Sequence, residues 1–220
     1  SNINDEFDCK NKSSLMIGPG LIDYLISKID KKSDLKLTLK NCNDPIFLIP
    51  LLYKYAKQTW IEPKKLFHHT GKGNTILEIG RYWGGSTVLL AMATHNSDVN
   101  VVSVDVVTGC HDPDVDDWLN DYEEKERIDI RVDNSWAMEN IPLSLLFVDG
   151  DHSYEGVKKD FIHHWNYLNG DCLAHDYGDP TCPGVTQFID EWINDGYADG
   201  IEQEGTMVAL KKLKDYEIDK

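Results

Sequence analysis

A buried strand that runs into a glycine-rich turn and then a helix is the feature that most constrains the fold of this chain. Residues 75–91 read TILEIGRYWGGSTVLLA. The apolar residues around Glu78 are typical of a strand that is covered on both faces. Gly80 and Gly84 allow positive φ or a close approach of backbone, and Ser86 is expected to cap the following helix. Because a helix start offers free N–H groups and partial positive charge, the turn predicts a nucleotide-like cofactor.

The glycine spacing narrows the choice of cofactor. In the dinucleotide fingerprint G-x-G-x-x-G, the middle glycine lets the backbone approach a pyrophosphate. Tyr82 occupies that position here. Its side chain would obstruct a pyrophosphate, but it can line a pocket for a smaller ligand that ends in an amino acid. The alternative is a turn whose glycines serve packing alone.

A second apolar strand, residues 101–105, ends in Asp105. In α/β folds an acid about 20 residues beyond the glycine-rich turn contacts the ribose hydroxyls of the cofactor. Asp105 is therefore predicted to bind a ribose. The alternative is a turn-forming or helix-capping aspartate, which is common at strand ends.

Two later strands each end in ionisable residues, namely Asp149, Asp151, His152, His175 and Asp176. In a parallel sheet these ends open on one edge, so the side chains are expected to converge. Such a cluster is costly unless it shares a metal, protons or a ligand. Asp149, His175 and Asp176 are predicted to hold a divalent cation, with His152 as a base. Oxygen ligands suit magnesium, whereas the imidazole favours manganese or iron. In the alternative, Asp149 and Asp176 cap helices and both histidines make ordinary hydrogen bonds.

From about Thr75 to its C-terminus, the chain resembles the class I small-molecule O-methyltransferases, which use S-adenosylmethionine (SAM). The resemblance rests on ordered motifs: E-x-G-x-x-x-G-x-S from Glu78, VDVVTG at 104–109, FVDGDHSYEGV at 147–157, HDY at 175–177 and PGV at 183–185. It extends to catechol O-methyltransferase and to antibiotic-sugar O-methyltransferases.

The resemblance implies roles for individual residues. It implies cofactor contacts from Glu78, Gly80, Tyr82, Gly84, Ser86, Asp105, Ser135, Trp136 and Asp149. A core position is the alternative for Trp136. It also implies His152 and Asp149 as catalytic residues, and Asp149, His175 and Asp176 as ligands of Mg or Mn. His175 departs from the Asp or Glu that metal-dependent members carry there, which weakens the assignment of magnesium.

The expected fold is α/β, a doubly wound Rossmann-like seven-stranded sheet with leading N-terminal helices and a C-terminal antiparallel hairpin. The hairpin strands are predicted at 200–203 and 206–212, around a Glu204–Gly205 turn. Helices are predicted at 44–59, 154–168 and 185–193. Residues 1–70 are expected to form an N-terminal helical lid or extension, and residues 71–220 a SAM-dependent methyltransferase domain. The pairs 64–65, 68–69 and 163–164 are typical of solvated helix faces.

The charge of the chain excludes some partners. With 22 Lys and Arg against 38 Asp and Glu, the formal net charge is −16. This sign disfavours nucleic acid and anionic membranes as partners. The five cysteines are odd in number and lack C-x-x-C spacing, and residues 1–10 lack the pattern of a signal peptide, so a cytoplasmic location is expected. A homodimer is common among the relatives.

The sequence therefore predicts a SAM-dependent methyltransferase that methylates oxygen on a small hydroxylated molecule, with assistance from a divalent metal. One alternative is a metal-dependent enzyme of the same fold with other chemistry, similar to cephalosporin hydroxylases. The others are a catalytically silent SAM-binding protein and a nicotinamide enzyme.

Overall fold

The computed structural model describes residues 62–217, apart from 71–72, 96 and 109–112. The helix predicted at 44–59 lies outside the described residues, as does nearly all of the predicted lid or extension (1–70). Of the five cysteines, Cys172 and Cys182 are described, and both are buried free thiols.

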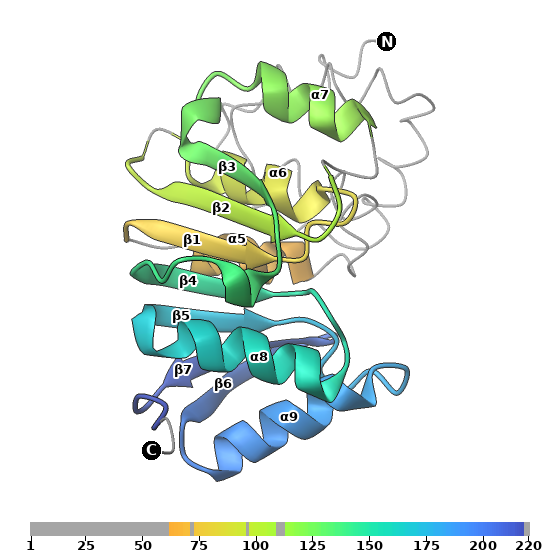
Figure 1. Cartoon of the computed structure of the whole chain (residues 1–220), viewed down its shortest axis with the longest axis vertical. Coiled ribbons are helices and arrows are strands. Elements are labelled where there is room, and N and C mark those ends of the chain that lie inside the picture. Colours follow the sequence, from red (N-terminus) through yellow and green to blue (C-terminus); the bar gives the residue numbers. More distant parts are fainter. Residues whose placement is uncertain (1–61, 71–72, 96, 109–112, 218–220) are drawn as a thin grey trace, which may run out of the picture.

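Seven strands form one mixed sheet in the order β3-β2-β1-β4-β5-β7-β6 (Figure 1). The first five pair in parallel, whereas β7 is antiparallel to both β5 and β6. Their bounds are β1 Thr75–Ile79, β2 Asn100–Asp105, β3 Ile128–Val132, β4 Leu143–Val148, β5 Leu168–Ala174, β6 Ala198–Glu204 and β7 Met207–Lys212. The predicted doubly wound sheet and its C-terminal antiparallel hairpin are confirmed.

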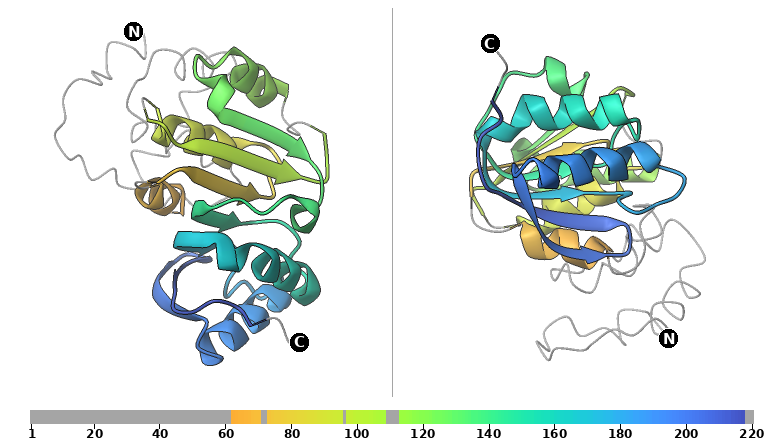
Figure 2. Two further views of the ribbon diagram at one scale, coloured as in Figure 1. Left: turned by 60° about the vertical axis from the view of Figure 1, so that its left-hand side comes forward. Right: turned by 90° about the horizontal axis from the view of Figure 1, so that it is seen from below.

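Helices cover both faces of the sheet, as the view along its plane shows (Figure 2). The described helices are α5 Glu62–His69, α6 Gly85–Ala93, α7 Pro113–Asp121, α8 Tyr154–His164 and α9 Pro183–Asn194. Successive side chains of β1 point to opposite faces of the sheet and so belong to two hydrophobic cores. Ile76 lies in the core with residues of α5, α6 and α7, and Leu77 in the core with residues of α8 and α9. The central strands are therefore buried on both sides, which explains their nearly continuous apolar sequences.

Some local expectations are wrong. Ser86 does not cap α6: the cap position is Gly84, with φ of 84°, and no side chain caps the helix. The pair 163–164 is not a solvated face, since His164 is buried and both rings contact backbone carbonyls. Lys65 is buried too, in an ion pair with Glu202. Among the described helices, none is both long and apolar enough to span a bilayer.

Candidate active site

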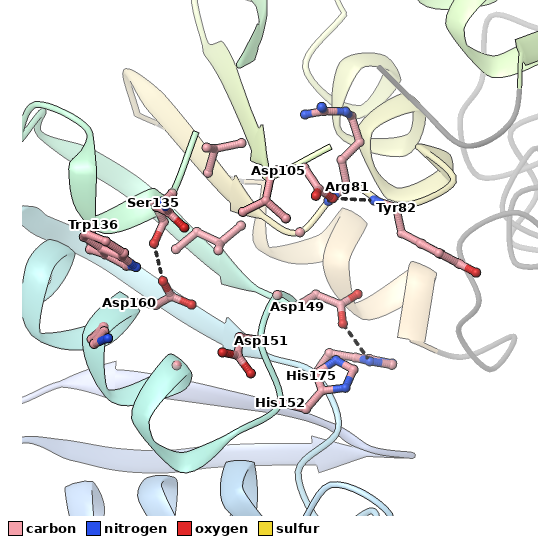
Figure 3. A pocket seen from close by; sticks show the side chains of 18 of the residues that line it. Arg81, Tyr82, Asp105, Ser135, Trp136, Asp149, Asp151, His152, Asp160 and His175 are labelled. Atoms are coloured by element: carbon pink, nitrogen blue, oxygen red, sulfur yellow. Dashed lines mark hydrogen bonds and ion pairs between the residues drawn. The ribbon is translucent and has the colours of Figure 1, made fainter. Parts of the chain in front are cut away.

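The sheet order reverses direction between β1 and β4, and α/β sheets bind ligands outside the carboxyl ends of their strands at such a point. A cavity of about 830 Å³ opens there, lined by residues that follow β1, β2, β3, β4 and β5 (Figure 3). The predicted site residues in its lining are Gly80, Tyr82, Ser86, Asp105, Ser135, Trp136, Asp149, His152, His175 and Asp176. The expected convergence of Asp149, Asp151, His152, His175 and Asp176 is therefore observed.

The turn after β1 needs its first glycine for two reasons. Gly80 has φ of 91°, and a Cβ there would lie 2.0 Å from the carbonyl oxygen of Asp149. The turn therefore lies directly against the end of β4. Tyr82 also has a positive φ, 45°, and its side chain is exposed at the cavity. This strained backbone conformation accompanies a side chain that lines the cavity, where a ligand can contact it.

Glu78 stabilises the turn through hydrogen bonds to residues on its far side. It is fully buried, and its carboxylate accepts hydrogen bonds from Ser86, Thr87 and Ser103. Burial raises its pKa, against the lowering effect of these hydroxyls. Neither Glu78 nor Gly84 is part of the cavity lining. In this structure both residues shape the turn, and their direct contact with a cofactor stays a prediction.

Asp105 is a fixed carboxylate at the cavity wall. Its Oδ2 accepts the N–H groups of Arg81 and Tyr82 at 2.8 and 2.9 Å, and its Oδ1 accepts the N–H of Val107 at 3.2 Å. Burial tends to raise the pKa of Asp105. The three N–H donors and the charge of Arg81 outweigh this effect, so the pKa lies below its ordinary value. Asp105 thus clamps the turn and still lines the cavity with a charged group that can accept further hydrogen bonds.

Arg81 is a residue that the sequence analysis missed. Its side chain is 2% exposed, and its guanidinium donates to the carbonyls of Ser103, Val107 and Arg131 at 2.9 to 3.4 Å. It ties the turn to β2 and β3 and places a positive charge behind Asp105. Arginine in a polar turn gives no sequence signal for burial, because its partners are distant backbone carbonyls.

The loop after β3 forms another wall of the cavity. Trp136 is 46% exposed, so the alternative of a core aromatic is wrong, and the ammonium of Lys159 lies 5.4 Å from its ring centre. Ser135 is buried and donates to the carboxyl of Asp160, which also lines the cavity. Burial raises the pKa of Asp160 to about 6. A carboxyl at this wall was missed because it belongs to α8, 25 residues from Ser135.

Three ligand-type atoms meet at the ends of β4 and β5. His175 Nδ1 lies 3.2 Å from Asp149 Oδ1 and 3.2 Å from Asp176 Oδ1. Among the described residues this buried nitrogen has no hydrogen-bond partner of adequate geometry. Asp149 and Asp176 do not cap the helices that follow, since α8 is capped by Ser153 and α9 begins after Cys182. The capping alternative is therefore wrong for both aspartates.

The carboxylates around His175 favour a positive charge at this place. Burial lowers the pKa of His175, but the carboxylates of Asp149, Asp176 and Glu62 outweigh that effect and raise it to about 12. Burial raises the pKa of Asp149, against the effect of His175. Either a proton on the imidazole or a metal ion can balance the carboxylates. Ligands about 2.1 Å from an octahedral ion lie roughly 3 Å apart, so the 3.2 Å distances fit a cation.

His152 stands beside this group. Its Nε2 lies 3.0 Å from Asp176 Oδ2, and its Nδ1 lies 3.5 Å from the Cys182 sulfur. The ring is 47% exposed at the cavity. Asp176 thus faces His175 with one oxygen and His152 with the other. Asp151, in contrast, accepts the N–H of Ser153 at the start of α8 and does not belong to the three-ligand group.

Comparisons with known proteins bear on the fold of this chain. Residues 77–177 match the model of a family described as a methyltransferase domain, whereas no curated protein sequence matches the chain. The O-methyltransferase NovP has a similar structure (TM-score 0.58, 15% identity, 84% of this chain and 100% of NovP). So does the methyltransferase PaMTH1 of Podospora anserina, solved with S-adenosylhomocysteine (SAH) (TM-score 0.57, 15% identity, 92% of this chain and 99% of PaMTH1).

A third similar structure is the MycE methyltransferase of mycinamycin biosynthesis, solved with Mg, SAH and mycinamycin VI. Its TM-score is 0.51 at 15% identity, over 74% of this chain and 54% of MycE. At such identities the neighbours establish the fold alone. The family match covers residues 77–177, and the similar structures show that this stretch lies within a methyltransferase-like fold.

Proposed function

We propose that the chain is a SAM-dependent O-methyltransferase that acts on a small hydroxylated molecule with the assistance of a divalent cation. The observation that carries the proposal is a single cavity with two chemically distinct ends. One end holds the Asp105 carboxylate beside a glycine-rich turn, and the other holds the Asp149, His175 and Asp176 group. The cavity volume, about 830 Å³, is sufficient for a cofactor and a small acceptor together.

The first end suits SAM. The Asp105 carboxylate would accept hydrogen bonds from the ribose hydroxyls, and Trp136 would cover one face of the adenine. Ser135 would hydrogen-bond near that ring. Tyr82 would line the methionine portion of SAM, at the position where its side chain would obstruct a pyrophosphate. The SAH complexes of PaMTH1 and MycE support SAM as the cofactor of this fold.

The second end suits a cation and an acceptor oxygen. Asp149, His175 and Asp176 would hold the ion, which when bound supplies Lewis-acid stabilisation of negative charge on the acceptor oxygen. A nitrogen ligand beside two carboxylates favours manganese or another borderline ion over magnesium. The magnesium in MycE supports a divalent cation in a related fold. Asp149 lines the same cavity as Asp105, so it could also contact the cofactor.

His152 is the candidate base. Methyl transfer from a sulfonium requires an in-line oxygen nucleophile that loses its proton, and an imidazole accepts a proton near neutral pH. The Asp176 carboxylate, 3.0 Å from His152 Nε2, would orient the ring. Fixing both reactants in one cavity can supply on the order of 7–11 kcal/mol of the barrier reduction when the partners are well aligned.

The proposal is tested by calorimetric titration of SAM into metal-stripped protein, repeated with manganese and with magnesium. Wild-type protein is expected to bind SAM. Asp105→Ala is expected to weaken SAM binding roughly 10- to 100-fold, since a hydrogen bond to a charged group contributes about 1.5–3 kcal/mol. Asp129→Asn is the matched control, because Asp129 is an exposed carboxylate of β3 that lies outside the cavity lining.

The absence of SAM binding under all three metal conditions would refute the methyltransferase assignment. Tight binding of NADH instead would point to a nicotinamide enzyme. SAM binding without methyl transfer to a panel of hydroxylated sugars, polyketides and phenols would favour a silent SAM-binding protein.

A further inference from the structure

A buried carboxylate from α5 lies directly behind His175. Glu62 is 1% exposed, and its Oε2 is 3.3 Å from His175 Nε2. Its other oxygen, Oε1, accepts the backbone N–H of Thr206 at 2.7 Å and the Thr206 hydroxyl at 2.9 Å. Glu62 therefore links three separate parts of the chain: helix α5, the end of β5 and the turn between β6 and β7.

The two nitrogens of His175 consequently face different partners. Nδ1 points at Asp149 and Asp176, whereas Nε2 points at Glu62. Because donors from Thr206 fix the carboxylate of Glu62 in place, its Oε2 is a ready acceptor for a hydrogen on Nε2. A hydrogen bond from Nε2–H leaves a neutral imidazole with its lone pair on Nδ1, the nitrogen that faces the two aspartates.

We propose that Glu62 is a positioning residue that makes His175 a metal ligand. It holds the ring orientation and the Nε2–H tautomer, so that Nδ1 can coordinate the cation that Asp149 and Asp176 bind. Metal-binding histidines characteristically donate their second ring N–H to a carboxylate or carbonyl, and loss of that partner lowers metal affinity about 10- to 100-fold. The inference rests on the cation site of the proposed function and adds a residue from α5 to it.

The charges around His175 also support a role for Glu62 in cation binding. A neutral histidine in place of a carboxylate gives the cation one negative charge less among its direct ligands. Glu62 restores a negative charge on the far side of the ring, and burial excludes the water that would screen it. This arrangement suits a divalent ion that accepts nitrogen, with manganese as the probe of choice.

Glu62→Gln gives the sharpest test, because glutamine keeps the size of the side chain. Its amide oxygen would accept the two Thr206 donors, so its NH2 group would face His175 Nε2. The ring would then carry its hydrogen on Nδ1, where it competes with the cation. Manganese affinity, measured from the paramagnetic resonance of the free ion, is expected to fall about 10- to 100-fold. SAM binding to the metal-free variant is expected to match that of wild type.

Glu202→Gln is the matched control. It removes the other carboxylate that ties α5 to the hairpin, through Lys65 at 2.8 Å, without contacting His175. Manganese affinity of this variant is expected to stay within about twofold of wild type. An equal loss in both variants, or no loss in Glu62→Gln, would overturn the proposal by reducing Glu62 to a packing role.

A spectroscopic measurement on wild-type protein does not depend on any variant folding. In zinc-loaded protein, 15N shifts of His175 are expected to report a protonated Nε2 and a metal-bound Nδ1. The opposite tautomer would overturn the proposal. If wild-type protein binds SAM but neither manganese nor zinc, the cation site and the role of Glu62 both fail while the cofactor assignment stands.

Discussion

Ser135 lines the cavity and forms hydrogen bonds with two buried ionisable side chains of α8. Its hydroxyl donates to the Asp160 carboxyl, and its backbone carbonyl accepts from His164 Nε2 at 3.0 Å. Burial raises the pKa of Asp160 to about 6, whereas burial and the neighbouring His163 lower the pKa of His164 to about 4. Both groups therefore favour their neutral forms, with opposite consequences for stability.

We expect His164→Gln to change how stability depends on pH. Between pH 6.5 and about 4 the unfolded chain protonates His164 and the folded chain does not, so this residue makes stability fall as pH falls. Asp160 acts in the opposite direction, because the folded chain keeps its proton up to about pH 6. The difference in unfolding free energy, wild type minus variant, should shrink by about 1–3 kcal/mol from pH 7 to pH 4.5.

Urea unfolding of wild type and His164→Gln between pH 7 and pH 4.5 measures this difference. The contributions of the carboxylates to the pH dependence are the same in both proteins, so they cancel in the comparison. Glutamine retains an N–H donor for the Ser135 carbonyl, so the contact itself is conserved. A free-energy difference that stays constant with pH would show that His164 titrates alike in the folded and unfolded chains.

Individual site residues were predictable where strand ends alone determine position. Asp105, Trp136, Asp149 and His175 follow parallel strands, and this topology brings them to one edge. Glu62 was not predictable, since it contacts a residue 113 positions away. The hydroxyl partners of Glu78 were not predictable either, because strand alternation next to a glycine turn does not tell whether a carboxylate faces a ligand or neighbouring hydroxyls.

At the scale of elements, α5 packs against the sheet and pairs with two of its strands. Leu66 is fully buried in the core with α6 and β1. His69 lies 2.8 Å from Asp171 of β5, and Lys65 pairs with Glu202 of β6. The boundary predicted at residue 70 was set by the start of the first motif. Six of the eight α5 residues are polar or proline, so its sequence gives little sign of burial.

Leu66→Ala is expected to lower the unfolding free energy by about 2–5 kcal/mol, because it leaves a cavity between α5 and the sheet. Ile201→Ala, at a residue that is 50% exposed on β6, should change it by less than about 0.5 kcal/mol. Chemical denaturation of both variants provides the comparison. A cost for Leu66→Ala as small as that of the control would mean that α5 detaches without loss to the core.

The elements that the sequence predicts well are those with continuous apolar runs. The strands predicted at 101–105 and 206–212 differ from β2 and β7 by one residue at their starts. The helix predicted at 154–168 instead ends at His164, after which a 3-10 turn at Trp165–Tyr167 leads into β5. Apolar spacing does not distinguish this turn from a continuing helix, because Trp165 is buried either way.

At the scale of the whole molecule, the net charge of −16 determines how stability responds to added salt in general. Self-repulsion among the carboxylates opposes the compact state, so any salt that screens it should raise the melting temperature. A specific site adds a second response, which follows the occupancy of that site. The two can be separated, because screening depends on ionic strength alone whereas site binding requires particular residues.

We expect manganese to stabilise the wild-type protein more than sodium chloride at equal ionic strength. Binding to the folded state adds about 2.7 kcal/mol when the free ion is 100 times its Kd. Asp149→Asn should abolish this excess, since it removes a ligand from the Asp149, His175 and Asp176 group, yet keep the response to sodium chloride because it changes the net charge by a single unit. Thermal melts of both proteins in the two salts make the comparison. Equal stabilisation by both salts in wild type would assign the cation response to screening, and the carboxylates around His175 would then be balanced by a proton on the imidazole.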